Sequence, residues 1–328
     1  MIKKAIIFLL FLPFLSQRGI KTNFAEGFYS PHKKNYRQMM RKFVQDISNY
    51  SKKINKNFLI IPQNGCEIIE KDGNLDERYL SSIDGMGQED LFYGFLEDNV
   101  PTPEEETNYI LSFLEKARDA GKKILVIDYC WSKEYVDDSY NKNFSHNFIS
   151  FAADHRELDD IPNYPKDPFN KNNENINSLK EAKNFLYLIN PQNFSKKEEF
   201  LNKLKDTDFD ILIIDLFWNG EILKPEEVNS LKIKKNGGRR LVISYISIGE
   251  AENYRYYWEE EWNENPPYWL LEENPDWEGN YTVKFWYYEW QSIIFGNNNS
   301  YIKKILDSNF DGALLDKIDV FEYFEGKN

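Results

Sequence analysis

Short apolar segments alternate with amphipathic segments along most of this chain. Residues 36–54 repeat their apolar positions every three or four residues, which predicts a helix with one buried face. Apolar runs that end in turn or acidic residues predict strands within 57–65, 83–90, 122–130, 147–154, 184–191, 209–221, 239–248 and 310–316. Helices are expected between them, including 104–120, where Thr102 and Glu105 form a capping pattern, and 300–306.

This alternation is typical of an α/β fold with a parallel sheet that is buried on both faces. A ninth apolar run, VKFWYY at 283–288, lies in a Trp-rich stretch that we assign to a long loop. Eight strands then remain, which is the number that closes a (β/α)8 TIM barrel, and about 250–300 residues suffice for one.

The two ends of the predicted barrel are complementary. The final strand, near Leu314, is followed by no obvious helix, and the first helix, near Phe43, is preceded by no strand of the barrel. In a closed ring these two elements would be neighbours, so the chain would begin and end inside one strand–helix unit. No change of composition marks a linker, and residues 26–328 are expected to form one domain.

Residues 1–25 have the layout of a signal peptide. Lys3 and Lys4 precede the uncharged apolar run 5–15, which is too short to span a bilayer. No clean cleavage site follows, and we place the cut before Glu26. No Cys follows the run, which disfavours a lipoprotein anchor, so the mature protein is predicted to be secreted or periplasmic without a membrane span.

The composition restricts the partners. The formal net charge of −13 argues against nucleic acid or an anionic membrane as a ligand. Aromatic residues make up 16% of the chain, and sugars stack on aromatic faces, although most such residues belong to protein cores. The two cysteines, Cys66 and Cys130, are too few for a disulfide framework, and a single bridge remains open.

Carboxylates recur where the predicted strands end. Barrel enzymes hold their chemistry at that end, so these acids are candidate site residues, although any one of them could instead cap a helix or lie on a solvated rim. They are Glu89, Asp128, Asp154, Asp215, Glu250, Glu252, Asp316 and Asp319, and the amide Asn64 follows a further strand in the same way.

No cofactor is expected. The three histidines lack the spacing of a zinc site, and the chain has neither a Gly-rich phosphate loop nor a G-x-S-x-G motif. An oxygen-ligand metal site stays open as an alternative. Paired carboxylates acting on a sugar, with aromatic side chains as stacking platforms, fit the pattern best.

Several motifs resemble one family of enzymes. YISIGEAENYRYYW, FDGALLDKIDVFEYF, IIPQNG, EDLFY, VIDY and VKFWYYEW look like the endo-α-1,4-polygalactosaminidase family, glycoside hydrolase family 114, over most of 57–324. The family usually runs from the strand resembling FLYLIN to the strand resembling ISFAAD, whereas here the last four strands come first. The resemblance therefore implies a circularly permuted barrel.

The resemblance also implies site residues. By motif, the catalytic pair maps to Asp316 in LLDKID and Glu89 in GQEDLF, with Glu89 as the acid/base and Asp316 as the nucleophile or base. The substrate groove would be lined by Asn64, Asp128, Tyr129, Asp215, Tyr245, Glu250, Glu252 and Trp286. The family's first strand usually carries a Gln where this chain has Leu188, so nothing is carried over at that position.

The resemblance implies cleavage of an amino-sugar polysaccharide of the polygalactosamine type, and the many carboxylates would suit a cationic sugar. A catalytically weak or inactive glycan-binding barrel is the alternative, and a metal-dependent carbohydrate-modifying enzyme is a third possibility.

Overall fold

The computed structural model describes residues 34–327, which contain a compact unit beginning at Asn35. Eight parallel strands make up its centre, and nearly all of their residues are buried, as expected of a sheet covered on both faces. In chain order they are β1 (Leu59–Pro62), β4 (Gly85–Glu89), β5 (Lys123–Tyr129), β6 (Ile149–Ala153), β7 (Leu186–Leu188), β8 (Ile211–Asp215), β11 (Leu241–Ser247) and β15 (Gly312–Asp316).

The eight strands form two parallel sheets rather than one continuous ring of hydrogen bonds. One sheet has the order β1-β15-β11-β8-β7, and the other has the order β4-β5-β6. At one seam, β1 and β4 are joined by a parallel bridge between Gln63 and Gly87. At the other seam, β6 and β7 lie side by side without a strand ladder between them. The parallel α/β architecture is confirmed, but the predicted closed ring is not seen as a hydrogen-bonded ring.

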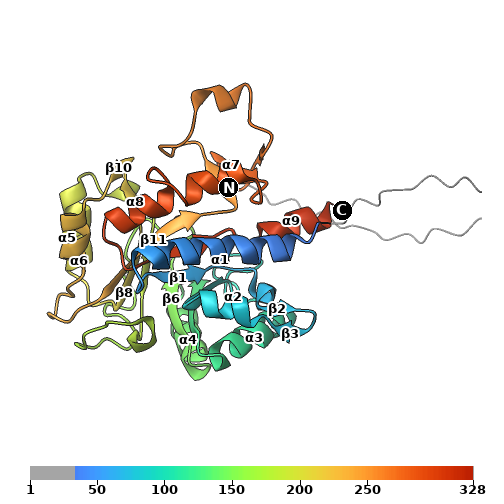
Figure 1. Cartoon of the computed structure of the whole chain (residues 1–328). Helices are drawn as coiled ribbons and strands as arrows, with labels where there is room; N and C mark the ends of the chain where they lie inside the picture. The colour runs from blue at the N-terminus through green and yellow to red at the C-terminus, as the bar shows by residue number, and fades with distance from the viewer. Residues whose placement is uncertain (1–33, 328) are drawn as a thin grey trace, which may run out of the picture. The chain divides into compact units, whose positions relative to one another are not determined.

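Helices connect nearly all neighbouring strands (Figure 1). The connection from β6 to β7, residues 154–185, differs because its only helical turn is the 3-10 helix at Leu179–Glu181. The α-helices are α1 (Tyr36–Ile54), α2 (Glu77–Ser82), α3 (Glu104–Asp119), α4 (Lys133–Ser145), α5 (Lys197–Lys205), α6 (Pro225–Leu231), α7 (Tyr288–Ile294), α8 (Tyr301–Asp307) and α9 (Val320–Gly326).

The two ends of the described chain meet, as predicted. Helix α1 begins where the Asn35 side chain accepts a hydrogen bond from the backbone N–H of Gln38, and it buries its periodic apolar face. Figure 1 shows α1, in blue, beside α9, in red, and β1 pairs in parallel with β15 from Leu59 opposite Gly312 onward. One expectation was wrong: the final strand is followed by a helix, the seven-residue α9.

The Trp-rich stretch lies outside the parallel sheets, as predicted, but the expectation of a long loop was wrong, because the stretch contains strands and a helix. Three antiparallel strands pair there in the order β12 (Glu250–Glu252), β14 (Asn280–Val283) and β13 (Leu270–Glu273). Two further hairpins pair β2 (Glu70–Lys71) with β3 (Asn74–Leu75), and β9 (Phe217–Trp218) with β10 (Glu221–Ile222). The capping pattern predicted for α3 does not form, because Pro103 occupies the N-cap and Thr102 donates to the carbonyl of Asp90 instead.

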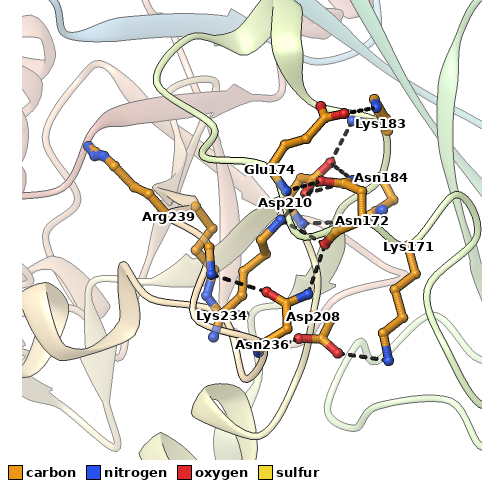
Figure 2. A network of polar contacts seen from close by, with 12 residues as sticks. Lys171, Asn172, Glu174, Lys183, Asn184, Asp208, Asp210, Lys234, Asn236 and Arg239 are labelled. Atoms are coloured by element: carbon orange, nitrogen blue, oxygen red, sulfur yellow. Dashed lines mark hydrogen bonds and ion pairs between the residues drawn. The ribbon is translucent and has the colours of Figure 1, made fainter.

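A buried polar network lies at the amino ends of β7 and β8 (Figure 2). Its centre is an ion pair between Lys234 Nζ and Asp210 Oδ1 at 2.9 Å, and both side chains are fully buried. Lys234 also donates to the backbone carbonyl of Asn172 at 3.0 Å, and Lys171 pairs with Asp208 at 2.8 Å. The network therefore ties the connection 154–185, which has no α-helix, to the underside of the barrel.

Both cysteines, Cys66 and Cys130, are buried free thiols. Within residues 34–327, no helix combines the length and the apolar character that crossing a membrane requires.

Candidate active site

A cavity of about 460 Å³ opens at the carboxyl ends of the parallel strands. Eight of the ten predicted site residues line it, namely Asn64, Glu89, Tyr129, Asp215, Tyr245, Glu250, Glu252 and Asp316. They come from seven different connections and strand ends, which converge because parallel strands finish at one face of the barrel.

Asp316 is the last residue of β15 and is held by its two neighbouring strands. Gln63 Nε2 donates to Asp316 Oδ1 at 3.1 Å, and the hydroxyl of Tyr245 donates to Oδ2 at 2.8 Å. Burial raises the pKa of Asp316, the negative charge of Glu89 raises it further, and Lys317 and the Tyr245 hydroxyl oppose both effects.

Glu89 is the last residue of β4 and is held in the same way. Asn64 Nδ2 donates to Glu89 Oε2 at 2.8 Å, and the Tyr129 hydroxyl donates to the other carboxylate oxygen. Strand β1 lies between β4 and β15, so the two acids arise two strand spacings apart, roughly 10 Å between backbones. Consecutive amides at the end of β1, Gln63 and Asn64, thus each fix one carboxylate.

Removing the Tyr245 hydroxyl tests this support. In Tyr245→Phe, Asp316 loses a donor that favours its charged form, so its pKa should rise further. If Asp316 acts as a carboxylate, the acidic limb of the kcat/KM–pH profile should move to higher pH.

Tyr79→Phe is the matched control, because that hydroxyl is buried outside the cavity and has no hydrogen-bond partner within residues 34–327. An unchanged acidic limb in Tyr245→Phe would show that the hydroxyl does not tune Asp316.

Asp215 and Glu252 line the cavity, but they are already paired with a cation. Arg255 Nη2 lies 2.7 Å from Asp215 Oδ2, and Arg255 Nε lies 2.6 Å from Glu252 Oε2. The Tyr254 hydroxyl donates to Glu252 at 2.7 Å. These two acids therefore hold Arg255 in the cavity wall, and Arg255 compensates one of their two negative charges.

Asp128 was predicted to line the groove, and this prediction is wrong. Successive strand residues point to opposite faces, so Tyr129 points into the cavity while Asp128 points out toward α4. There Asp128 is fully buried and accepts hydrogen bonds from Ser139 Oγ at 2.6 Å and Asn143 Nδ2 at 3.1 Å. It anchors α4 to β5.

Trp286 was also predicted to line the groove, and it does not. After β14 the chain turns toward the helical layer, where the Trp286 ring lies 5.0 Å from Tyr36 and 4.7 Å from Phe324. The tryptophan that does line the cavity is Trp277, which is 40% exposed, and Tyr254 is exposed beside the same cavity.

The cavity also contains residues that sequence reasoning missed. Arg156 lies 4.1 Å from the centre of the Tyr129 ring and pairs with Asp90 at 2.8 Å, so it holds the side chain that contacts Glu89. Asp319, a candidate from the sequence that could also have been a helix cap, lines the cavity without capping α9 by its side chain, and burial raises its pKa to about 7. Gln63 could have been predicted as a site residue, because it adjoins Asn64 in the motif IIPQNG.

One cluster has side chains of the types that bind metals. Oxygen and nitrogen atoms of Asp154, His155 and Asp160 lie within 4.8 Å of one another. His155 already uses both ring nitrogens, since Nδ1 lies 2.7 Å from Asp154 and Nε2 contacts Asp159. Both ring nitrogens thus face carboxylates, and although burial lowers the pKa of His155, these contacts raise it overall.

The second half of the chain is similar to one known family. Residues 167–328 match the model of glycoside-hydrolase family GH114. An uncharacterized protein of Methanocaldococcus jannaschii is 42% identical over 182 residues, which are 54% of this chain and 49% of that protein. Uncharacterized proteins of Thermotoga maritima and Deinococcus radiodurans are 41% and 31% identical over 37% and 39% of this chain.

The matched segments cover 36% and 39% of those last two proteins, so the chain spans about half or less of the relatives' lengths. The family match includes Asp215, Tyr245, Glu250 and Asp316 and leaves Glu89 in the preceding half. Residues 167–328, just under half of the chain, are therefore similar to the domain of glycoside-hydrolase family GH114.

Proposed function

We propose that this protein is an exported glycoside hydrolase that cleaves an amino-sugar polysaccharide with Glu89 and Asp316. The observation that carries the proposal is the position of two carboxylates in one cavity, each fixed by a neighbouring amide of β1, in a chain with a GH114 domain. In such a reaction one carboxyl gives a proton to the leaving oxygen, and the other attacks the sugar or activates water.

A hydrolysis screen tests this function directly. De-N-acetylated galactosamine polymers, their N-acetylated forms and neutral galactans would be incubated with the protein, and new reducing ends would be counted. Release from an amino-sugar polymer supports the proposal. Binding without release would indicate a glycan-binding barrel, and loss of release in chelator would indicate a metal-dependent enzyme.

Trp277 is the aromatic platform that the cavity offers to a sugar ring. Trp277→Ala should raise KM about tenfold, or roughly 1.4 kcal/mol, and leave kcat within a factor of about two, because stacking acts on bound substrate and transition state alike. Trp131→Ala is the matched control, since Trp131 is 54% exposed and does not line the cavity. If Trp131→Ala raised KM more than Trp277→Ala, the proposal that a sugar ring stacks on Trp277 would be wrong.

Export and permutation complete the proposal. The signal peptide 1–25 lies outside the described residues, and the N-terminal sequence of protein recovered from the medium tests it.

A permuted order would explain why the family match starts at residue 167, after β1, β4, β5 and β6. The connection from β6 to β7, which has no α-helix, would then join the first and last strands of the unpermuted order. A variant that begins near residue 167 and in which residue 328 is joined to residue 35 by a linker should therefore fold.

A further inference from the structure

The acids of the cavity differ in how completely their oxygens are satisfied. Both carboxylate oxygens of Glu89 and both of Asp316 accept hydrogen bonds, and Asp215 and Glu252 are paired with Arg255. Among these acids, Glu250 alone has a buried oxygen without a partner within the described residues 34–327.

Glu250 lies at the start of β12 and is only 4% exposed. Its Oε1 accepts a hydrogen bond from Asn274 Nδ2 at 2.8 Å and pairs with Lys317 Nζ at 3.1 Å. Its Oε2 is buried and has no donor. A buried, unsatisfied carboxylate oxygen costs free energy, so a ligand that supplies a hydrogen-bond donor recovers that cost.

The charges around Glu250 favour a cationic donor over a neutral one. Lys317 is the cation that contacts Glu250, and the same ammonium is shared with the nearby charges of Asp316 and Asp319. Three carboxyl groups thus surround one lysine in a half-buried cavity, where a second positive charge is stabilised more strongly than in water. A charge-assisted hydrogen bond is also about twice as strong as a neutral one.

We propose that Glu250 determines specificity by receiving the ammonium group of an amino sugar on its unpartnered Oε2. This inference rests on the proposed function, because it assumes that a sugar occupies the cavity. Asp215 and Glu252 are not the residues that bind the amine, because both carboxylates are already paired with Arg255 and neither has a buried oxygen without a partner among the described residues.

Binding without turnover tests the inference separately from catalysis. Galactosamine, galactose and N-acetylgalactosamine would be titrated into wild type and Glu250→Gln, with NMR detection of millimolar affinities. Wild type should prefer the free amine, and Glu250→Gln should lower that preference at least tenfold with a near-native Tm. Glu278→Gln is the matched control, because Glu278 lines the same cavity but is exposed, and it should keep the preference.

Wild type alone gives a second measurement if Glu250→Gln folds poorly. Its affinity for galactosamine should fall as the pH rises through the pKa of the sugar's own amine, while its affinity for galactose should not follow that titration. An unchanged amine preference in Glu250→Gln, or no preference in wild type, overturns the inference. If wild type hydrolyses the polymer but Glu250→Gln keeps the amine preference, only the inference about Glu250 is refuted. If the amine preference depends on Glu250 but wild type hydrolyses nothing, only the catalytic proposal is refuted.

Discussion

Asp316→Asn and Glu89→Gln are each expected to lower kcat by about 100-fold to 10,000-fold on a confirmed polysaccharide substrate. Each change keeps the shape of the side chain and removes the group that carries or accepts the proton. Tm should stay nearly unchanged, because the amide still offers an oxygen to Gln63 or Asn64. Glu278→Gln removes an acid from the rim of the same cavity and should retain near-wild-type turnover.

Near-wild-type turnover in either variant would end the assignment, and Glu250 or Asp215 would become the next candidate. The same variants also divide the roles. The resemblance assigns Asp316 as the nucleophile or base, yet burial and Glu89 raise the pKa of Asp316, a direction that suits a proton donor. A substrate with an activated aryl leaving group needs no donated proton, so the variant that still cleaves it has lost the acid.

Asp210→Ala is expected to destabilise the fold by about 3–5 kcal/mol, because it leaves the ammonium of Lys234 fully buried without its counter-charge. The same carboxylate also accepts hydrogen bonds from Asn172 Nδ2 and from the backbone N–H of Lys183, so two further donors lose their acceptor (Figure 2). Urea unfolding followed by circular dichroism measures the loss.

Asp206→Ala provides the control for that change. Asp206 pairs with Lys235 at 2.9 Å, but both side chains are largely exposed, and the expected change is below about 1 kcal/mol. Replacing both buried partners, as in Asp210→Leu with Lys234→Met, should recover much of the stability. Equal losses for Asp206→Ala and Asp210→Ala would show that the buried pair does not hold the underside of the barrel.

Most of the parallel strands were predictable from sequence because they are apolar runs bounded by turn or acidic residues, whereas β4 has the sequence GMGQE and contains one large apolar residue, Met86. Their shared direction then places Glu89 and Asp316 at one face of the barrel without any knowledge of side-chain contacts. Strand alternation could also have excluded Asp128, because Tyr129 and Asp128 cannot both point inward. The sequence indicated which residues end strands, and periodicity alone would have sorted them by face.

The remaining features depend on contacts between distant parts of the chain. Arg255 lies within the motif that predicted the groove, but its partner Asp215 is forty residues away. The ion pair between them could therefore not be predicted from the sequence. Trp277 and Trp286 lie in one aromatic stretch, and only the turn after β14 decides which of them faces the cavity. The partner of the Glu250 carboxylate is likewise defined by the αL conformation of Lys317, at φ 61°.

The connection 154–185 contributes to both ends of the molecule at once. Arg156 and Asp159 lie at the cavity rim, while Lys171 and Asn172 belong to the polar network under the barrel. Sequence changes at the cavity rim in this segment are therefore limited by the contacts that the same segment makes in the polar network under the barrel. A lineage that changes its substrate through this loop has to conserve the underside contacts, whereas the loops after β5 or β11 can diversify without that obligation.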